Sequence, residues 1–255
     1  MQKTVCDFLG RLSWKQCRSK HKDPSEEKVC HNICNNTSLE ALKAYHAVTV
    51  KELTQGNSTR KIVEMIFKSS WVTPVMKDVN FERVLKINHR EDILWKFEEY
   101  RETVKRRACK TCSRCMADGN EVLRFHGTTS MCSLNVLNGV IKVCSVEGCH
   151  VCEILRTVFY YKSRGSLRGI YTTSTSGLAH DSTHLHGHNK SDSTISVKRV
   201  MLLCRVIAGH VHKPLNSHES FWKVSSESGN DYKIREVFLS DHRAFLPCFL
   251  IVYSL

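Results

Sequence analysis

Cysteines spaced like metal ligands are the first residues of this sequence that could do chemistry. Cys144, Cys149 and Cys152 form a C-x4-C-x2-C pattern, and Cys132 precedes them at a distance that allows a fourth thiolate. Four thiolates are a common tetrahedral ligand set for a structural Zn²⁺ ion. The pattern therefore predicts a zinc site at these four residues. The alternative is a group of buried, reduced cysteines.

Three other groups carry weaker signals of metal binding. Cys109, Cys112 and Cys115 form C-x2-C-x2-C in a basic loop without an evident fourth ligand. Segment 30–46 (C-x3-C-x11-H) resembles the first three ligands of a Cys2His2 finger, but no second histidine follows within about five residues. Segment 184–188 (H-x-H-x-H) is polar, and a solvated loop is the simpler interpretation. We therefore expect no nucleic-acid-reading finger here.

A histidine, a tyrosine and a glutamate lie in three separate short motifs. They are His126 in RFHGTT, Tyr171 in GIY and Glu236 in EVFLSD. Each residue alone has an ordinary explanation. His126 fits a loop histidine, Tyr171 a core aromatic with its hydroxyl at the surface, and Glu236 an exposed carboxylate on an edge strand.

Taken in order, these motifs resemble the catalytic domain of the poly(ADP-ribose) polymerase-like (PARP-like) ADP-ribosyltransferases, the class with a His-Tyr-Glu triad. That family also has a Leu-Leu-Cys-x-Val strand and a Pro-x-Tyr/Phe-Leu ending, which correspond to LLCRV at 202–206 and PCFL at 247–250. The resemblance covers roughly residues 58–255. It is closest to plant proteins that carry a PARP-like domain behind a degenerate zinc-finger-like segment.

The resemblance implies an NAD-dependent enzyme that cleaves the nicotinamide–ribose bond and transfers ADP-ribose. By resemblance, Glu236, His126 and Tyr171 are the catalytic residues. Glu236 accepts from the ribose 2′-hydroxyl and stabilises the oxocarbenium-like transition state. His126 binds the adenosine ribose, Gly127 offers its backbone to the nicotinamide amide, Thr128 completes that turn, and Tyr171 packs against nicotinamide.

The sequence also departs from the family pattern. The serine expected eight residues after Tyr171 is replaced by Ala179, and Ser176 replaces it only if the loop is shortened. A second stacking aromatic is also missing, with His180 or His184 as poor substitutes. The lost stack is worth about 1 kcal/mol, so a slow or inactive domain is the alternative.

Apolar periodicity predicts the elements that must position these residues. Ser58 is expected to cap a helix over 60–71, a strand is expected over 81–87, and Asn88 and Glu91 have the spacing of a capping box before an amphipathic helix. Further strands and a helix are expected at 121–126, 200–208, 236–239, 248–253 and 153–161. Loops are expected at 174–198 and 215–233.

Helices early and strands late predict an α+β fold. The PARP-like resemblance implies split antiparallel β-sheets with few helices. Residues 1–56 are interpreted as a basic appendage rich in cysteine and histidine. Residues 58–255 form the main domain, with lead-in helices over 58–115 and an NAD-binding core over 116–255.

Composition and charge limit the class of protein and its cellular location. The chain has 255 residues, a formal charge of +13 and 13 cysteines. No apolar segment is long enough to span a membrane, and no signal region is evident, so we expect an intracellular protein with reduced thiols. The positive charge favours the nucleus over the cytoplasm and allows contact with nucleic acid.

Three functions follow. The first is mono-ADP-ribosyl transfer from NAD to a protein or nucleic acid acceptor. The second is a weak or inactive PARP-like domain that acts as an interaction module. The third is a zinc- and nucleic-acid-binding protein.

Overall fold

Seven strands form one antiparallel sheet in the order β1-β2-β9-β7-β3-β6-β8. The computed structural model describes residues 48–71, 79–137, 140–141, 143–160, 169–185, 197–210 and 235–255. The sheet strands are β1 (Val48–Glu52), β2 (Asn80–His89), β3 (Glu121–Ser130), β6 (Ile170–Thr173), β7 (Lys198–Ile207), β8 (Glu236–Leu239) and β9 (Phe245–Ser254). A separate hairpin is made by β4 (Val136–Leu137) and β5 (Val140–Ile141).

Five α-helices and one 3₁₀ turn accompany these strands in the described ranges. They are α4 (Ser58–Ser69), α5 (Glu91–Arg107), α6 (Ser113–Asp118), α7 (His150–Thr157), α8 (Ser176–Leu185) and η1 (His242–Ala244). The predicted α+β class is confirmed. None of the described helices is long and apolar enough to cross a membrane.

The centre of the sheet is β7, which pairs with β9 on one side and β3 on the other. Its residues from Val200 to Ile207 are all buried, as the continuous apolar run predicted. A strand covered on both faces has no polar side to present to solvent, and this is why it lacks alternation.

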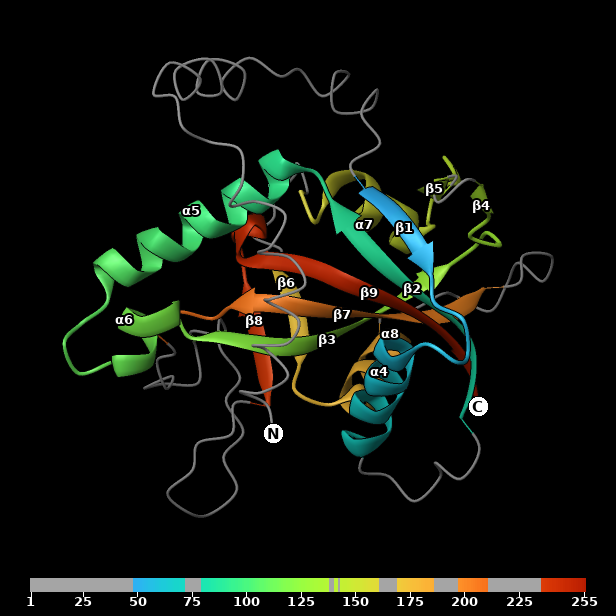
Figure 1. Cartoon of the computed structure of the whole chain (residues 1–255), viewed down its shortest axis with the longest axis horizontal. Helices are drawn as coiled ribbons and strands as arrows, with labels where there is room; N and C mark the ends of the chain where they lie inside the picture. The colour runs from blue at the N-terminus through green and yellow to red at the C-terminus, as the bar shows by residue number, and fades with distance from the viewer. Residues whose placement is uncertain are drawn as a thin grey trace.

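Each face of the sheet has its own hydrophobic core. The core that contains Val63, Phe67 and Phe125 packs under α4 and α8, which lie together below the strands in Figure 1. The core that contains Ile154 and Phe159 packs under α7 on the opposite face. The candidate motifs on β3, β6 and β8 therefore lie between two helical layers.

Helix starts differ from the prediction at two places. Helix α4 is capped by Asn57, whose side chain accepts from the N–H groups of Thr59 and Arg60, so the cap precedes the predicted Ser58 by one residue. Helix α5 has Arg90 at its N-cap without a side-chain hydrogen bond, so the Asn88–Glu91 capping box is wrong. Residue 88 is extended and pairs with β1, which removes it from the helix start.

Two larger expectations also need correction. Residues 48–52 were assigned to the appendage but form β1 of the main sheet, so the boundary at residue 56 is too late. Residues 176–185 were expected to be loop but form α8, because the small residues of this stretch pack closely on β3. The Cys/His segment 30–46, residues 186–188 and the predicted loop 215–233 lie outside the described residues.

The predicted division of the main strands into two sheets is not observed. All seven strands are hydrogen-bonded in one sheet, but β3 and β6 share a single register pair, Phe125 with Thr173. The sheet is therefore weakest where the His126 and Tyr171 motifs meet.

Candidate functional site

His126, Tyr171 and Glu236 come from three neighbouring strands, β3, β6 and β8. Strand β6 pairs with β8 so that Tyr171 lies opposite Phe238 and Thr173 opposite Glu236. Gly169 at the start of this pairing has no room for a side chain, because a Cβ there would lie 2.5 Å from Cε1 of Phe238. The GIY motif is thus built for close contact with the Glu236 strand.

Tyr171 and Glu236 are joined directly. The Tyr171 hydroxyl donates to Oε1 of Glu236 at 2.7 Å, and both side chains are half-buried. Burial and the neighbouring carboxylate raise the pKa of Tyr171, so the phenol stays a neutral donor. The carboxylate is therefore held by a hydrogen bond rather than left to turn in water.

His126 reaches Tyr171 through the main chain. Its Nδ1 lies 2.7 Å from the Tyr171 carbonyl oxygen, where an N–H at this position donates. The other side of the ring packs edge-on against Phe159, with ring centroids 5.1 Å apart. The imidazole therefore links β3 to β6 next to their single register pair.

The three side chains do not all share one face of the sheet. Phe125 belongs to the core under α8 and pairs with Thr173, which in turn pairs with Glu236, so all three side chains lie on that face of the sheet. Side chains alternate between the two faces along a strand, so Tyr171, two residues before Thr173, lies on the same face. The His126 ring instead contacts Phe159, which belongs to the core on the α7 face. The structure brings Tyr171 and Glu236 together and places the imidazole behind the Tyr171 backbone.

Gly127 is covered by helix α8. A Cβ at this position would lie 2.1 Å from the carbonyl oxygen of Ala179 and 2.3 Å from Oγ1 of Thr183. The Thr183 hydroxyl donates to the same Ala179 oxygen at 2.9 Å. The surface that the family resemblance assigns to nicotinamide is thus packed against helix backbone in this conformation. Thr128, the next residue, is buried.

The serine considered as a substitute is used elsewhere. Ser176 is fully buried, and its hydroxyl donates to the Phe67 carbonyl oxygen at 2.7 Å and lies 2.9 Å from Oγ of Ser70. These contacts tie the start of α8 to the end of α4. Ser176 therefore acts as a packing residue in this conformation, which argues against the predicted role in cofactor binding. His180, considered as a stacking group, is buried between Trp71 and Tyr253.

The four cysteines predicted as ligands do come together. The Sγ atoms of Cys132, Cys144, Cys149 and Cys152 all lie within 4.8 Å of one another. Sγ of Cys132 is 3.5 Å from that of Cys152 and 3.9 Å from that of Cys149. In a tetrahedral site with Zn–S bonds of about 2.3 Å, the sulfur atoms are about 3.8 Å apart. The donor set and its size therefore fit a Zn²⁺ ion.

The cluster also has supporting contacts. The Met131 N–H donates to Sγ of Cys149 at 3.4 Å, and Arg156 donates to the Cys144 carbonyl oxygen. Burial opposes ionisation of Cys149, but hydrogen bonds from Met131 and neighbouring thiols outweigh it and lower its pKa to about 7. Burial and nearby thiolates raise the pKa of Cys152. The four thiols therefore do not all ionise readily by themselves. A divalent cation would stabilise all four thiolates at once.

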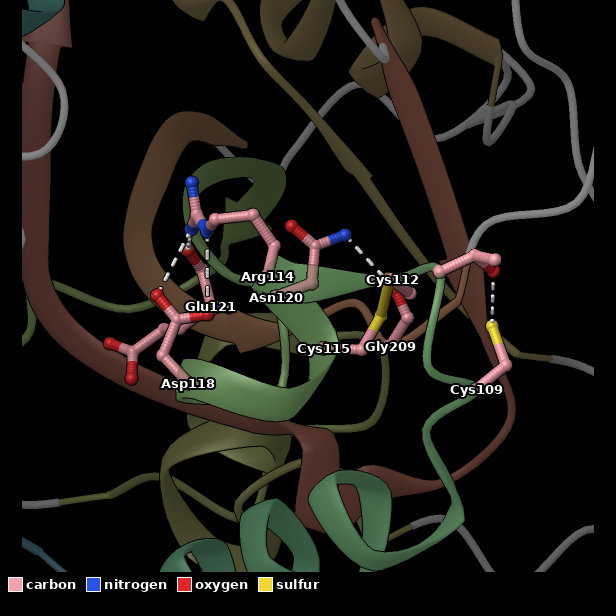
Figure 2. The surroundings of a disulfide bond; sticks show 9 residues. Cys109, Cys112, Arg114, Cys115, Asp118, Asn120, Glu121 and Gly209 are labelled. Atoms are coloured by element: carbon pink, nitrogen blue, oxygen red, sulfur yellow. Dashed lines mark hydrogen bonds and ion pairs between the residues drawn. A yellow bond between two sulfur atoms is a disulfide. The ribbon is translucent and has the colours of Figure 1, made fainter.

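Cys112 and Cys115 form a disulfide in the structure, shown in Figure 2. This pair differs from the expectation of reduced thiols. Cys112 is the N-cap of α6 and Cys115 lies in its first turn, and their Cα atoms are 5.4 Å apart, a distance that permits a disulfide. The third member of the group, Cys109, is a free, exposed thiol. The three residues therefore do not act together as a set of zinc ligands here.

Sequence reasoning missed Phe159 and Thr183. Phe159 contacts the ring of His126, and Thr183 faces Gly127. No local pattern marks either residue, because both contacts depend on how α7 and α8 pack on β3. The available signal was the share of small residues in segment 176–183 (SGLAHDST), which allows close helix packing.

In comparisons with known proteins, no family model matches this chain, and no curated protein sequence matches it significantly. The chemistry of the candidate site therefore rests on its own residues.

Proposed function

We propose that this chain is a PARP-like ADP-ribosyltransferase domain in which Glu236 acts on the nicotinamide ribose of NAD. The observation that carries this proposal is the hydrogen bond from the Tyr171 hydroxyl to Oε1 of Glu236 at 2.7 Å. Two residues that the family resemblance names as catalytic are 65 positions apart in the chain and meet across two paired strands.

The chemistry requires a fixed negative charge beside the sugar. Cleavage of the nicotinamide–ribose bond develops positive charge at the anomeric carbon, and a pre-oriented carboxylate lowers the energy of that state. Tyr171 orients Glu236 by donating to Oε1, and Oε2 has no hydrogen bond within the described residues, so it can accept from a ribose hydroxyl. His126 supports the Tyr171 backbone from the next strand. Transfer to a protein or nucleic acid nucleophile completes the reaction.

We also propose that Cys132, Cys144, Cys149 and Cys152 bind a structural zinc ion. Cys132 follows β3, which carries His126, whereas Cys149 and Cys152 belong to the start of α7. The metal would therefore join the end of β3 to α7. Four thiolates leave no open position for a substrate, so its role is to hold the fold.

A second candidate is the same domain without turnover, acting as an interaction module. The observation that favours it is the packing of Ala179 and Thr183 on Gly127, which fills the surface where the family binds nicotinamide. Movement of α8 away from β3 would be needed before a ligand could reach that surface.

Labelled NAD distinguishes the two candidates. The wild-type chain is incubated with radiolabelled NAD and a protein mixture, and ADP-ribose on protein is measured. The transferase proposal expects labelling that Glu236→Gln abolishes and Glu102→Gln, at an exposed carboxylate on α5, retains. Wild-type labelling equal to that of Glu236→Gln would contradict the transferase proposal. Absence of NAD binding at millimolar concentration would leave the module as the function.

A further inference from the structure

The three cysteines around the start of α6 differ in their exposure. Cys112 is partly exposed, whereas its disulfide partner Cys115 is fully buried. Cys109 is exposed and precedes Cys112 by the same spacing at which Cys115 follows it. Cys112 therefore presents part of its surface to solvent, whereas Cys115 does not.

Cys109 is a free, exposed thiol in the same segment. Its Sγ lies 3.1 Å from the Thr111 hydroxyl, and hydrogen bonding from Thr111 lowers the pKa of the thiol. Arg107 and Lys110 next to it are exposed and positively charged. Positive charge and hydrogen-bond donors favour the thiolate, which is the reactive form.

We propose that Cys112 and Cys115 form a thiol–disulfide exchange site for low-molecular-weight thiols, with Cys112 as the sulfur that is attacked. This proposal is independent of the transferase function, because none of the three cysteines contributes to the Tyr171–Glu236 pair or to the four-cysteine cluster.

The exchange has two balanced steps. A thiolate RS⁻ attacks Sγ of Cys112, the Cys112–Cys115 bond breaks, and Cys115 leaves as a thiolate that takes a proton from water. A second thiolate attacks the outer sulfur of the mixed disulfide and forms RSSR. Cys112 is then released and takes a proton as well. The protein pair gains two electrons and two protons, which the two external thiols lose.

The disulfide joins the N-cap of α6 to its first turn, and α6 lies at the junction between β3 and the chain after β7. Figure 2 shows Arg114 reaching Asp118 and the Glu121 carbonyl oxygen, with Nη2 distances of 3.1 and 2.8 Å. The Asn120 side chain donates to the Gly209 carbonyl oxygen at 2.9 Å. These bonds hold α6 against the start of β3 and the chain just after β7. Reduction removes the cross-link within α6, so this junction should open more often.

The test uses the full chain in glutathione buffers whose reduced-to-oxidised ratio is varied. Free thiols are blocked with N-ethylmaleimide, and Cys109, Cys112 and Cys115 are quantified by peptide mass spectrometry. We expect Cys109 to lose its label only through a glutathione adduct at the oxidised end of the series, whereas Cys112 and Cys115 become labelled together as reduced glutathione increases. Hydrogen exchange at Gly119, Asn120 and Gly209 should increase over the same range.

Single-cysteine variants test which sulfur is attacked. With oxidised glutathione, Cys115→Ser should accumulate a glutathione adduct on Cys112, whereas Cys112→Ser should form none on the buried Cys115. Cys109→Ser should leave the wild-type transition in place. The proposal is overturned if Cys112 and Cys115 are fully labelled without reductant, or if excess reduced glutathione leaves both unlabelled. The labelling of the wild-type chain across the glutathione series tests the proposal even if a variant fails to fold.

Discussion

At the scale of single residues, the site depends on one neutral donor that faces one carboxylate. Tyr171 retains its proton because burial and Glu236 both raise its pKa. The hydrogen bond therefore persists over the whole physiological pH range. A charge-assisted bond of this kind is worth about 1.5–3 kcal/mol.

Tyr171→Phe tests this role within the transferase proposal. The ring is kept and only the donor is lost, so kcat for ADP-ribosyl transfer should fall about 10- to 100-fold. Thermal unfolding should also shift down by several degrees, because the folded state loses the same hydrogen bond. Unchanged kcat would show that Glu236 needs no orienting donor.

His89 links folding stability to pH. Burial lowers its pKa from 6.5 to about 4, with a smaller contribution from Arg205, although Nε2–H donates to the Pro247 carbonyl oxygen. Nδ1 is buried and has no hydrogen-bond partner within the described residues, so a proton there would be unsatisfied. The folded state therefore prefers neutral His89, whereas the unfolded state accepts a proton near pH 6.5.

The folded-state pKa of His89 is depressed, so its contribution is complete above pH 6.5 and is lost as pH falls to 4. We expect wild type to lose about 2–3 kcal/mol of unfolding free energy over this interval from His89 alone. Urea unfolding of wild type and His89→Gln at pH 7 and pH 4.5 measures the difference. Gln retains a donor for Pro247 but does not titrate. If both proteins lose the same unfolding free energy between pH 7 and pH 4.5, the prediction is refuted.

At the scale of elements, the contact between α8 and β3 decides whether the surface at Gly127 is covered. Gly127 permits this contact because it lacks a side chain. The Ser176 bonds to α4 fix the other end of α8. A helix predicted as loop thus becomes the covering layer of the site.

Gly127→Ala should push α8 away from β3. The added Cβ would lie 2.1 Å from the Ala179 carbonyl oxygen. This overpacking should lower the unfolding free energy by about 3 kcal/mol. Gly56→Ala is the matched control, because nothing lies within 4 Å of a Cβ there, and it should change stability by less than about 0.5 kcal/mol. Equal melting temperatures for the two variants would contradict the close packing.

At the scale of the whole molecule, the four-cysteine cluster connects segments that the sheet alone does not hold together. Cys132 and Cys152 are 20 residues apart, and their Sγ atoms lie 3.5 Å from each other. A metal at this point would bind the folded chain far better than the unfolded chain. It would therefore add to stability directly.

Metal analysis of purified protein should find one zinc ion per chain. Cys152→Ser should reduce zinc to background and lower the unfolding free energy by about 3 kcal/mol, or roughly 6–12 °C in Tm. Cys109→Ser, which changes an exposed thiol outside the cluster, should retain both metal and Tm. Zinc at background in the wild type would remove the metal proposal.

Several features could be predicted from the sequence because their cause is local. The apolar run of β7, the helical spacing in α5 and the Cys144–Cys152 pattern each follow from residues close in the chain. The sequence alone therefore predicted the α+β class, most strands, and the four cysteines that the structure brings together.

Other features were decided only by tertiary structure. The Tyr171–Glu236 bond, the packing of α8 on Gly127 and the placement of the His126 ring each need segments that are tens of residues apart. Strand pairing and helix packing bring such segments together, and their geometry depends on the free energy of the whole core rather than on any local pattern.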